Sequence, residues 1–515
     1  MQYRYKSTRG GEQDYSFEEA LLSGYAPDGG LFVPASLPTI EKEQYSLWSK
    51  MSFPELAYDV LRKFISPQEI DDENLQRICD KSYHLDSFDD ESYIPIKDVG
   101  PSLHIAELFH GPTFCFKDFG MRPVINFLSY FAELRNRPTT LLVSTTGDTG
   151  PAAVQAVNDA SNPLLTILVH YPHGQISDFQ RKQLTTLQSD FVKVASFEGG
   201  GDDMDLPIKE TLLSSKKDDK QFGKERGDRM FCGINSYNIG RPLVQMIHFI
   251  FIYLRLIEKM GLSLGDEIFL VDMVLPTGAM GNLTGAYLAK QMGIPIGKLY
   301  CGCNINDITH RVIDRGEFHQ EKIQKTLSEA LNVEVPYNFE RILYYLSSGN
   351  TLLVKEWMEE MDKTRRLTLE EEWLKRLKHD FGSASISDDE MCKSIQDTYE
   401  CFDNYLCDPH TAIAVAAAKK LGLCADIPTQ SRRKVVIIAT ASPCKFEEAV
   451  TLALGKESWI DWKSDFFPSR AQRTMELDEI KPFHYEWGGQ HATLSEVQPK
   501  WKDEMMRIVF AHFGE

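Results

Sequence analysis

Residues Thr140–Ser144 read TLLVS and are followed by the turn TTGDTG (145–150) and by a helical pattern from Pro151 to Ala160. The apolar run is short and continuous, as expected for a strand of a parallel sheet that is covered on both faces. Proline is well suited to the first turn of a helix. The stretch therefore predicts one strand–turn–helix unit of an α/β fold.

The same alternation extends in both directions along the chain. Further short apolar runs predict strands at Leu165–His170, Phe191–Val194, Ile268–Val274 and Val435–Ala439. Helical patterns lie between them, at Pro242–Met260 and Leu283–Met292. Strands that alternate with helices predict a parallel, doubly wound sheet, or two of them.

The length of 515 residues suggests about three domains, or two large ones. Residues 1–98 mix short helical patterns with loops, end near the acidic stretch DSFDDE (86–91), and are predicted to form an N-terminal domain. Residues 99–455 carry the strand–helix alternation and are predicted to form a core of two α/β lobes. Residues 456–515 show little periodicity and are predicted to be a C-terminal appendage. EGGGDDMD (198–205) and the charged stretch 214–229 are predicted to be loops.

The balance of charge limits the range of partners. The chain has 56 Lys and Arg residues against 75 Asp and Glu residues, a formal net charge of −19. A chain this acidic is a poor candidate for binding nucleic acid or an anionic membrane. The apolar stretch Leu243–Ile257 contains Gln245, His248 and Arg255, and is interpreted as too short and too polar to span a membrane.

The ten cysteines are scattered and form no CxxC pair. Free, mostly buried thiols in a reducing compartment explain them better than a disulfide framework. The first residues, MQYRYKSTRGG, show no apolar segment of a secretory signal. His110 and His410 are isolated in the sequence, so core or cap roles are expected for them and no metal site is expected. We expect a cytoplasmic protein.

A lysine in HGPTFCFKD (110–118) is the first candidate for catalysis. Lys117 opens a helical pattern, and the positive end of the helix dipole and the neighbouring Phe114 and Phe116 disfavour its ammonium form and lower its pKa. Such an amine can attack a carbonyl group. Taken alone, the segment is more typical of an ordinary lysine at the start of a helix.

Two further turns are suited to anions. STTGDTGP (144–151) and PTGAMGN (276–282) each join a strand to a helix, where backbone N–H groups, hydroxyls and glycines can hold a phosphate or a carboxylate. The second turn matches neither the Walker A motif nor the dinucleotide-binding motif GxGxxG. Each also fits a plain capped turn, so singly they are weak evidence.

Two more segments add polar groups at strand ends and helix starts. NSYNIGR (235–241) carries an arginine, the natural partner of a doubly charged phosphate. Thr440 follows the predicted strand Val435–Ala439, at the sheet edge where α/β proteins bind ligands. A cap with a surface arginine and a strand-ending turn are the plainer interpretations. Together the five segments fit an anionic cofactor and an anionic substrate, without identifying either.

In this combination the segments resemble the threonine synthase family, among the fold-type II pyridoxal-phosphate (PLP) enzymes. The resemblance is carried, in family order, by STRG (7–10), SGYAPDGGLFVP (23–34), ELFHGPTFCFKD (107–118), STTGDTGPAA (144–153), NSYNIGR (235–241), LPTGAMGN (275–282) and CDPHTA (407–412). It implies two doubly wound lobes, PLP as cofactor, and a small phosphorylated amino acid as substrate.

The resemblance also assigns roles to individual residues. It implies that Lys117 forms a Schiff base with PLP and that Thr440 faces the pyridine nitrogen. The residues implied to hold the PLP phosphate are Thr277, Gly278, Ala279, Met280, Gly281 and Asn282. Those implied to bind the substrate carboxylate are Ser144, Thr145, Thr146, Gly147, Asp148 and Thr149, and those implied to contact its phosphate are Asn238 and Arg241.

Several positions depart from the usual family pattern. Ala279 stands where the phosphate loop GNxG has Asn, and Ser442 stands where the stretch TAHPAKF has His. The loop PTGAxGN and the stretch VPYNFERILYYLSSG (335–349) look closer to threonine synthase-like 2 proteins, which are phospholyases acting on O-phosphohomoserine or O-phosphothreonine. The resemblance thus implies a carbon–oxygen lyase that gives 2-oxobutanoate, as a monomer or homodimer. A true threonine synthase and a non-catalytic PLP-binding protein are the alternatives.

Overall fold

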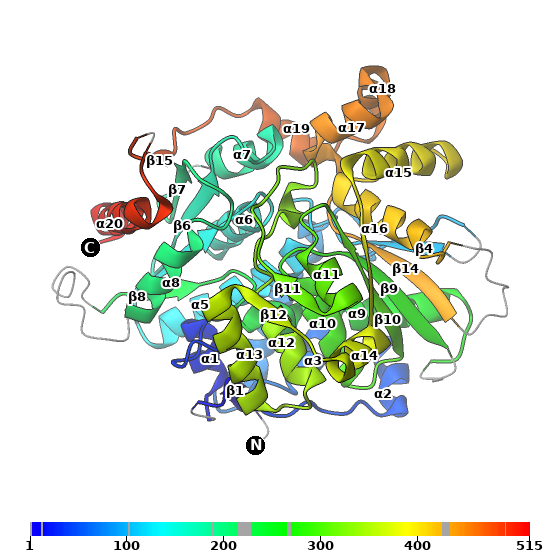
Figure 1. Cartoon of the computed structure of the whole chain (residues 1–515), viewed down its shortest axis with the longest axis horizontal. Coiled ribbons are helices and arrows are strands. Elements are labelled where there is room, and N and C mark those ends of the chain that lie inside the picture. Colours follow the sequence, from blue (N-terminus) through cyan, green and yellow to red (C-terminus); the bar gives the residue numbers. More distant parts are fainter. Residues whose placement is uncertain are drawn as a thin grey trace.

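The computed structural model describes residues 3–11, 14–100, 103–187, 189–214, 228–264, 269–424, 433–489 and 491–514. Its two large sheets lie side by side, and helices cover their faces (Figure 1). Because neighbouring strands in both sheets are parallel apart from one edge strand, the prediction of two doubly wound lobes is confirmed.

The five-stranded sheet has the order β15-β7-β6-β5-β8 and is parallel throughout. Its strands are β5 (Thr139–Ser144), β6 (Leu165–Pro172), β7 (Val192–Phe197), β8 (Met230–Gly233) and β15 (Phe483–Tyr485). The six-stranded sheet has the order β13-β10-β9-β14-β4-β3 and is parallel except for β3. Its strands are β3 (Ile96–Asp98), β4 (Leu103–Glu107), β9 (Leu270–Pro276), β10 (Ile296–Cys303), β13 (Phe381–Ser385) and β14 (Arg433–Ala439).

The helices fall into three groups along the chain. The N-terminal part contains α1 (Phe17–Ser23), α2 (Lys42–Trp48), α3 (Phe53–Leu61), α4 (Asp72–Ser82), the 3-10 turn η1 (Leu85–Ser87) and the antiparallel pair β1 (Tyr5–Ser7) and β2 (Phe32–Pro34). The helices between β4 and β10 are α5 (Lys117–Leu134), α6 (Thr149–Ala160), α7 (Asp178–Thr185), α8 (Asp205–Ser214), α9 (Gly240–Lys259) and α10 (Gly281–Gln291).

The third group follows β10. It comprises α11 (Ile308–Arg315), η2 (Glu329–Leu331), α12 (Phe339–Leu346), α13 (Thr351–Thr364), α14 (Glu371–Asp380), α15 (Asp388–Cys401), α16 (Pro409–Lys420), η3 (Pro443–Lys445), α17 (Glu447–Leu454), α18 (Lys456–Phe466), α19 (Ser469–Glu476) and α20 (Leu494–Phe513). Strands β11 (Glu317–His319) and β12 (Arg366–Thr368) form a small antiparallel pair.

Helix α9 is the central helix of the fold. It packs against α3, α5 and α10, and its residues belong to the largest apolar core. The interpretation of Leu243–Ile257 as too short and too polar for a membrane span does not hold for the whole helix, because α9 has 20 residues and is, by length and composition, apolar enough to cross a membrane. However, 94% of its most apolar 18-residue window is buried inside the protein, as in the core helix of a globular fold.

The predicted strands and helices correspond to β5, β6, β7, β9, β14, α6, α9 and α10, with ends shifted by a few residues. Ile268, the first residue of the predicted strand Ile268–Val274, lies outside the described part of the chain. Most of the predicted loop 214–229 also lies outside it. The loop predicted at 198–205 precedes α8. All ten cysteines are free and seven are buried, as expected.

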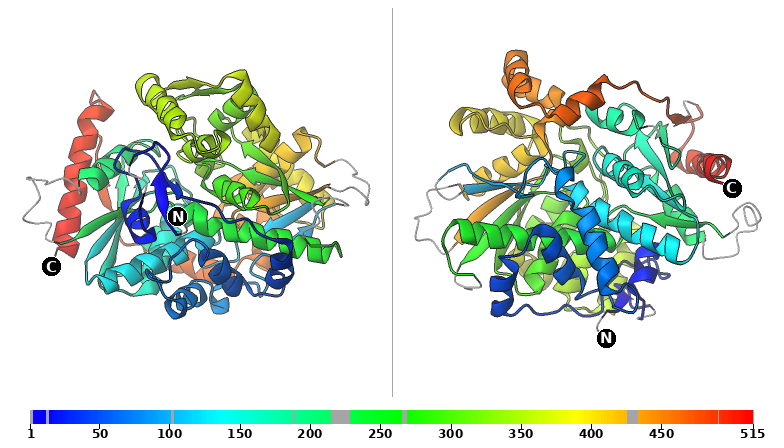
Figure 2. Two further views of the ribbon diagram at one scale, coloured as in Figure 1. Left: turned by 90° about the horizontal axis from the view of Figure 1, so that it is seen from below. Right: turned by 180° about the vertical axis from the view of Figure 1, so that it is seen from behind.

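The domain limits at 98 and 456 are not sharp in the structure. Strand β3 lies in the predicted N-terminal domain but pairs with β4 in the six-stranded sheet. The C-terminal residues supply β15 to the five-stranded sheet, and α20 packs against α8 at the outer side of that lobe (Figure 2). The C-terminal part of the chain thus contributes one strand and one helix to this lobe.

Candidate active site

One pocket lies at the carboxyl ends of strands from both sheets. Ser144 ends β5, Pro276 ends β9 and Thr440 follows β14, and all three line the pocket. This is the edge at which α/β proteins bind ligands. The other predicted residues in its lining are Lys117, Thr145, Thr146, Asp148, Thr149, Arg241, Thr277, Gly278, Ala279, Met280, Gly281 and Asn282.

Lys117 is the first residue of α5 and lines the pocket. Its Nζ lies 4.8 Å from the centre of the Phe116 ring. Burial, together with the positive charge of Arg241, lowers the pKa of Lys117 to about 8. A larger share of the Lys117 side chain is therefore neutral amine near neutral pH than for an ordinary lysine, and the direction of the pKa shift is the one expected from the sequence.

The turn 277–282 is shaped to hold an anion. Met280 adopts the left-handed conformation (φ 60°, ψ 10°) and Gly281 begins α10. A left-handed residue followed by a right-handed helical one makes successive N–H groups converge, at a helix N-terminus. A Cβ on Gly278 would lie 2.8 Å from the carbonyl oxygen of Ala330, so this position has no room for a side chain.

Asn282 offers a free donor in the same turn. Its Oδ1 is 2.8 Å from Nε2 of His248, a buried residue of α9. The histidine thereby fixes the orientation of the amide, and Asn282 Nδ2 is buried without a hydrogen-bond partner among the described residues. A buried donor needs an acceptor, and the phosphate of PLP fits this position together with the converging N–H groups.

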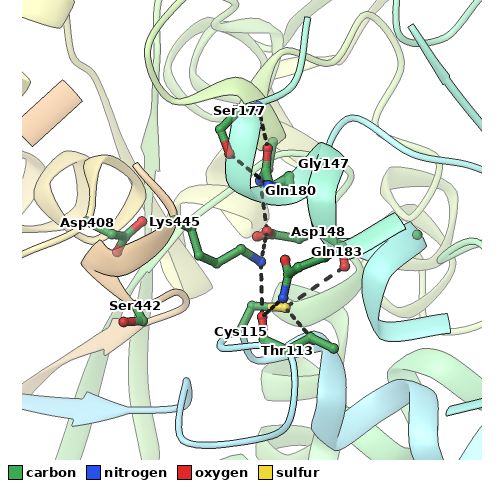
Figure 3. Close-up of polar contacts among 12 residues, drawn as sticks. Thr113, Cys115, Gly147, Asp148, Ser177, Gln180, Gln183, Asp408, Ser442 and Lys445 are labelled. Carbon is green, nitrogen blue, oxygen red and sulfur yellow. Dashed lines mark hydrogen bonds and ion pairs between the residues drawn. The ribbon is translucent and has the colours of Figure 1, made fainter. Parts of the chain in front are cut away.

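A buried ion pair crosses from one lobe to the other beside the pocket. Lys445, which follows β14, places Nζ 2.6 Å from Oδ1 of Asp148, and both side chains are almost completely buried (Figure 3). Burial would raise the pKa of Asp148, but the Lys445 ammonium outweighs burial and lowers it to about 2. Asp148 is therefore ionised at every physiological pH.

The same ammonium connects the turns that carry the predicted catalytic and substrate-binding residues. Lys445 Nζ also donates to the carbonyl oxygen of Thr113 at 3.2 Å, and Thr113 is held by Asp118 next to Lys117. Gln180 Nε2 donates to Asp148 Oδ1 at 2.9 Å, which adds α7 to the network (Figure 3). Lys445 stands in the motif TASPCKF, but only the fold shows what it contacts.

The two residues predicted to contact a substrate phosphate are placed differently. Arg241 lines the pocket, and its Nη1 donates to the carbonyl oxygen of Ile234 at 3.1 Å while its Nε has no partner among the described residues. Asn238 lies outside the lining. Its Nδ2 donates to the carbonyl oxygens of Leu21 and Gly233, and its Oδ1 accepts from the N–H of Gly240, so it supports the turn and has no place at the substrate.

Three further residues discussed in the sequence analysis lie in or outside the pocket lining contrary to expectation. Gly147 is absent from the lining, since its left-handed backbone (φ +136°) packs against the Gln180 amide. Ser442, discussed above for its departure from the family, accepts from the N–H of Cys444 and also lies outside the lining. The ring of His410 hydrogen-bonds to the Asp408 side chain, which is the structural role expected for it, and His410 also lines the pocket.

Two acidic residues of the pocket were not predicted as site residues. Asp202 accepts the N–H of Glu334 at 2.9 Å, and Asp205 accepts the hydroxyl of Tyr337. These contacts tie the glycine-rich loop after β7 to the segment before α12. Burial raises the pKa of Asp202 to about 6 and that of Asp205 well above its ordinary value. The only signal in the sequence was that both residues lie in a glycine-rich loop.

No metal centre is visible in the described ranges, since nowhere in them do three His, Cys, Asp or Glu side chains form a metal-binding group.

Gly278→Ala is expected to weaken PLP binding by the apoprotein at least tenfold, because the added methyl group would push the Ala330 carbonyl away from the phosphate turn. Spectroscopic titration with PLP measures the affinity. Gly200→Ala is the matched control, because its Cβ would meet nothing closer than 3.4 Å. Equal affinities for the two variants would show that the turn does not hold the phosphate.

Comparison with known proteins agrees with this site. Residues 4–83 match the model for the threonine synthase N terminus, and residues 411–481 match that for threonine synthase, C-terminal. Threonine synthase-like 2 of Pongo abelii is 34% identical, over 87% of this chain and 89% of that protein.

Solved structures extend the match over nearly the whole chain. Threonine synthase from yeast is 30% identical with a TM-score of 0.82, covering 98% of this chain and 99% of that one. A PLP-bound threonine synthase from Brucella melitensis is 28% identical with a TM-score of 0.81, covering 97% and 99%. The order of the motifs, the fold and these similarities agree, and the chain belongs to the threonine synthase family.

Proposed function

We propose that this protein is a PLP-dependent phospholyase that converts O-phosphohomoserine and water to 2-oxobutanoate, ammonia and phosphate. The observation that carries the proposal is the joint lining of one pocket by an amine of lowered pKa, an anion-binding turn, a hydroxyl-rich turn and an arginine. Family membership supports PLP as the cofactor, and the Brucella melitensis relative was solved with PLP bound.

PLP, when bound, stabilises the negative charge that develops when a proton leaves Cα of an amino acid. The residues that would hold it are Lys117, the turn from Gly278 to Asn282, and Thr440. Because the hydroxyl of Thr440 is neutral, it cannot pair with a protonated pyridine nitrogen as a carboxylate would. Proton transfer therefore depends more on the position of the Lys117 amine.

The protein's own groups divide the remaining tasks. The neutral amine of Lys117 can take the Cα proton and return it to another carbon of the substrate. The turn from Ser144 to Thr149 presents hydroxyls and N–H groups to the substrate carboxylate at the start of α6. Arg241, whose Nε has no partner in the described part of the chain, would bind the substrate phosphate and stabilise it as it leaves.

The product depends on whether water is added before the unsaturated intermediate leaves. Ala279 brings only a methyl group to the pocket at the position where family members usually carry Asn, which supports loss of water addition. Ser442, the other departure from the family pattern, does not line the pocket, so we attribute the loss of water addition to Ala279 alone. A true threonine synthase is the second candidate, because the structural match to threonine synthase from yeast covers 98% of this chain.

Incubation of the PLP-loaded protein with O-phosphohomoserine is expected to release phosphate and 2-oxobutanoate in equal amounts, with no threonine. Phosphate assay and amino-acid analysis of the same samples measure the three compounds. Ala279→Asn is expected to shift part of the product to threonine, because the amide can hold a water molecule. Threonine as the main product of the unmodified protein would favour the synthase.

A further inference from the structure

A second cavity of about 330 Å³ lies beside the active site and shares no lining residue with it. Its walls come from the segment leading into α7, from residues 325–329, and from η3, α17, α18 and α19. Helices α7, α17, α18 and α19 lie at one end of the molecule (Figure 1). The C-terminal part of the chain thus forms much of the wall of this cavity. Its volume is at the lower end of the range of small-molecule sites.

The buried ion pair separates the two cavities. Asp148 lines the active-site pocket and Lys445 lines the second cavity, with 2.6 Å between their charged atoms (Figure 3). A second connection runs along the backbone, because Glu329 lines the second cavity while the next residues, Ala330 and Leu331, line the active-site pocket. An occupant of the cavity would lie one ion pair away from the predicted substrate-binding turn.

Glu329 brings an unsatisfied acceptor atom, Oε2, to this cavity, while the backbone N–H of Ser177 hydrogen-bonds to its carboxyl group. Its Oε2 is shut off from solvent and accepts no hydrogen bond from the described residues. The buried ammonium of the cavity, Lys445, is already paired with Asp148, and Lys325 and Lys463 are exposed. Burial raises the pKa of Glu329 to about 8; the charge of Lys325 and the N–H of Ser177 act against this rise, and the charges of Glu448 and Asp148 add to it. A shielded carboxyl oxygen without a hydrogen-bond partner among the described residues is costly unless a cation or a donor meets it.

The other walls are apolar and aromatic. Trp459, Phe179 and Phe446 are buried side chains in the lining, and Phe467 and Met475 are partly buried beside them. Aromatic faces attract organic cations and also bind flat apolar groups. The lining therefore combines one unsatisfied acid with a surface suited to an apolar body.

We propose that this cavity is a second ligand site, which binds a small organic cation: a protonated amine on an apolar, ring-sized body, with its N–H donating to Glu329 Oε2. This site goes beyond the proposed reaction and does not depend on its product. The ligand differs from the phosphorylated substrate in charge, so the two are not expected to compete.

Calorimetric titration of the PLP-loaded protein with N,N-dimethylphenethylamine tests the site. This tertiary amine is charged at neutral pH and cannot condense with the aldehyde of PLP. The matched neutral probe is N,N-dimethyl-2-phenylacetamide, which has the same carbon–nitrogen skeleton. We expect the amine to bind at least about tenfold more tightly than the amide, as a charge-assisted hydrogen bond should give.

Glu329→Gln is expected to reduce the affinity for the amine to that for the amide, while Glu448→Gln, which alters an exposed acid of the same cavity, changes it less than about twofold. Lys117→Ala should leave binding intact. The proposal is overturned if the two probes bind equally, if Glu329→Gln has no effect, if Lys117→Ala abolishes binding, or if no saturable binding occurs.

Discussion

Lys117→Ala is expected to lower the rate of phosphate release from O-phosphohomoserine by at least about a thousandfold, because it removes the group that holds and moves the substrate proton. The variant should still bind PLP through the turn 278–282, but without a covalent link. Borohydride treatment followed by peptide mass analysis should therefore fix the cofactor on the unmodified protein and leave the variant unlabelled.

The lowered pKa of Lys117 also predicts a pH dependence. Only the neutral amine attacks an aldehyde, so the rate at which the apoprotein captures PLP should rise with pH and level off above pH 8, in accord with the pKa of about 8. An ordinary lysine would require a pH near 10.5. Because Arg241 contributes to the shift, Arg241→Met should move the midpoint to higher pH.

Lys355→Ala is the matched control for Lys117→Ala, because it removes an exposed lysine that does not line the pocket. It should leave labelling and phosphate release unchanged. A Lys117→Ala variant that keeps more than a tenth of the activity would contradict the role of Lys117 and would direct attention to His410 or Asp202 as the proton carrier.

The sequence predicted the turns of the site well because their signals are local. Glycine, proline and hydroxyl residues between a strand and a helix mark a βα junction wherever it occurs, and parallel strands bring such junctions to one sheet edge. The turns after β5 and β9 and the residue after β14 therefore met in one pocket. The strands β3, β4, β8, β13 and β15 of the two large sheets were missed, since short strands carry little periodic signal.

Long-range contacts were beyond the reach of the sequence. Asn238 has the composition of a ligand-binding residue, yet its amide bonds to the backbone of Leu21, 217 residues away. His248 looked like part of an apolar helix, but it orients Asn282 from the opposite side of the turn. Lys445 and Asp148 are 297 residues apart. No local pattern contains such pairings, which depend on how the two lobes pack.

Lys445→Met is expected to lower the free energy of unfolding by about 3–5 kcal/mol at pH 7, because it leaves the carboxylate of Asp148 buried without its cation. The double variant Lys445→Met with Asp148→Asn should regain much of this loss, since an uncharged amide can still accept from Gln180. Urea unfolding of the three proteins measures the values. Lys463→Met, at an exposed position of the same region, should change the free energy by less than about 0.5 kcal/mol.

The loss of free energy of unfolding in Lys445→Met should also depend on pH, and it should become smaller in acid. In the unmodified protein the pKa of Asp148, about 2, lies below the ordinary value of 3.8, so its ion pair stabilises the fold above pH 4 and the contribution is lost as the pH falls toward 2. Without Lys445, burial dominates and raises the pKa of Asp148, so acid relieves the buried charge of the variant. The difference in free energy of unfolding between the unmodified protein and Lys445→Met should therefore shrink below pH 4. A difference that stays constant with pH would mean that the variant is destabilised by lost packing around the lysine chain and not by the unpaired carboxylate.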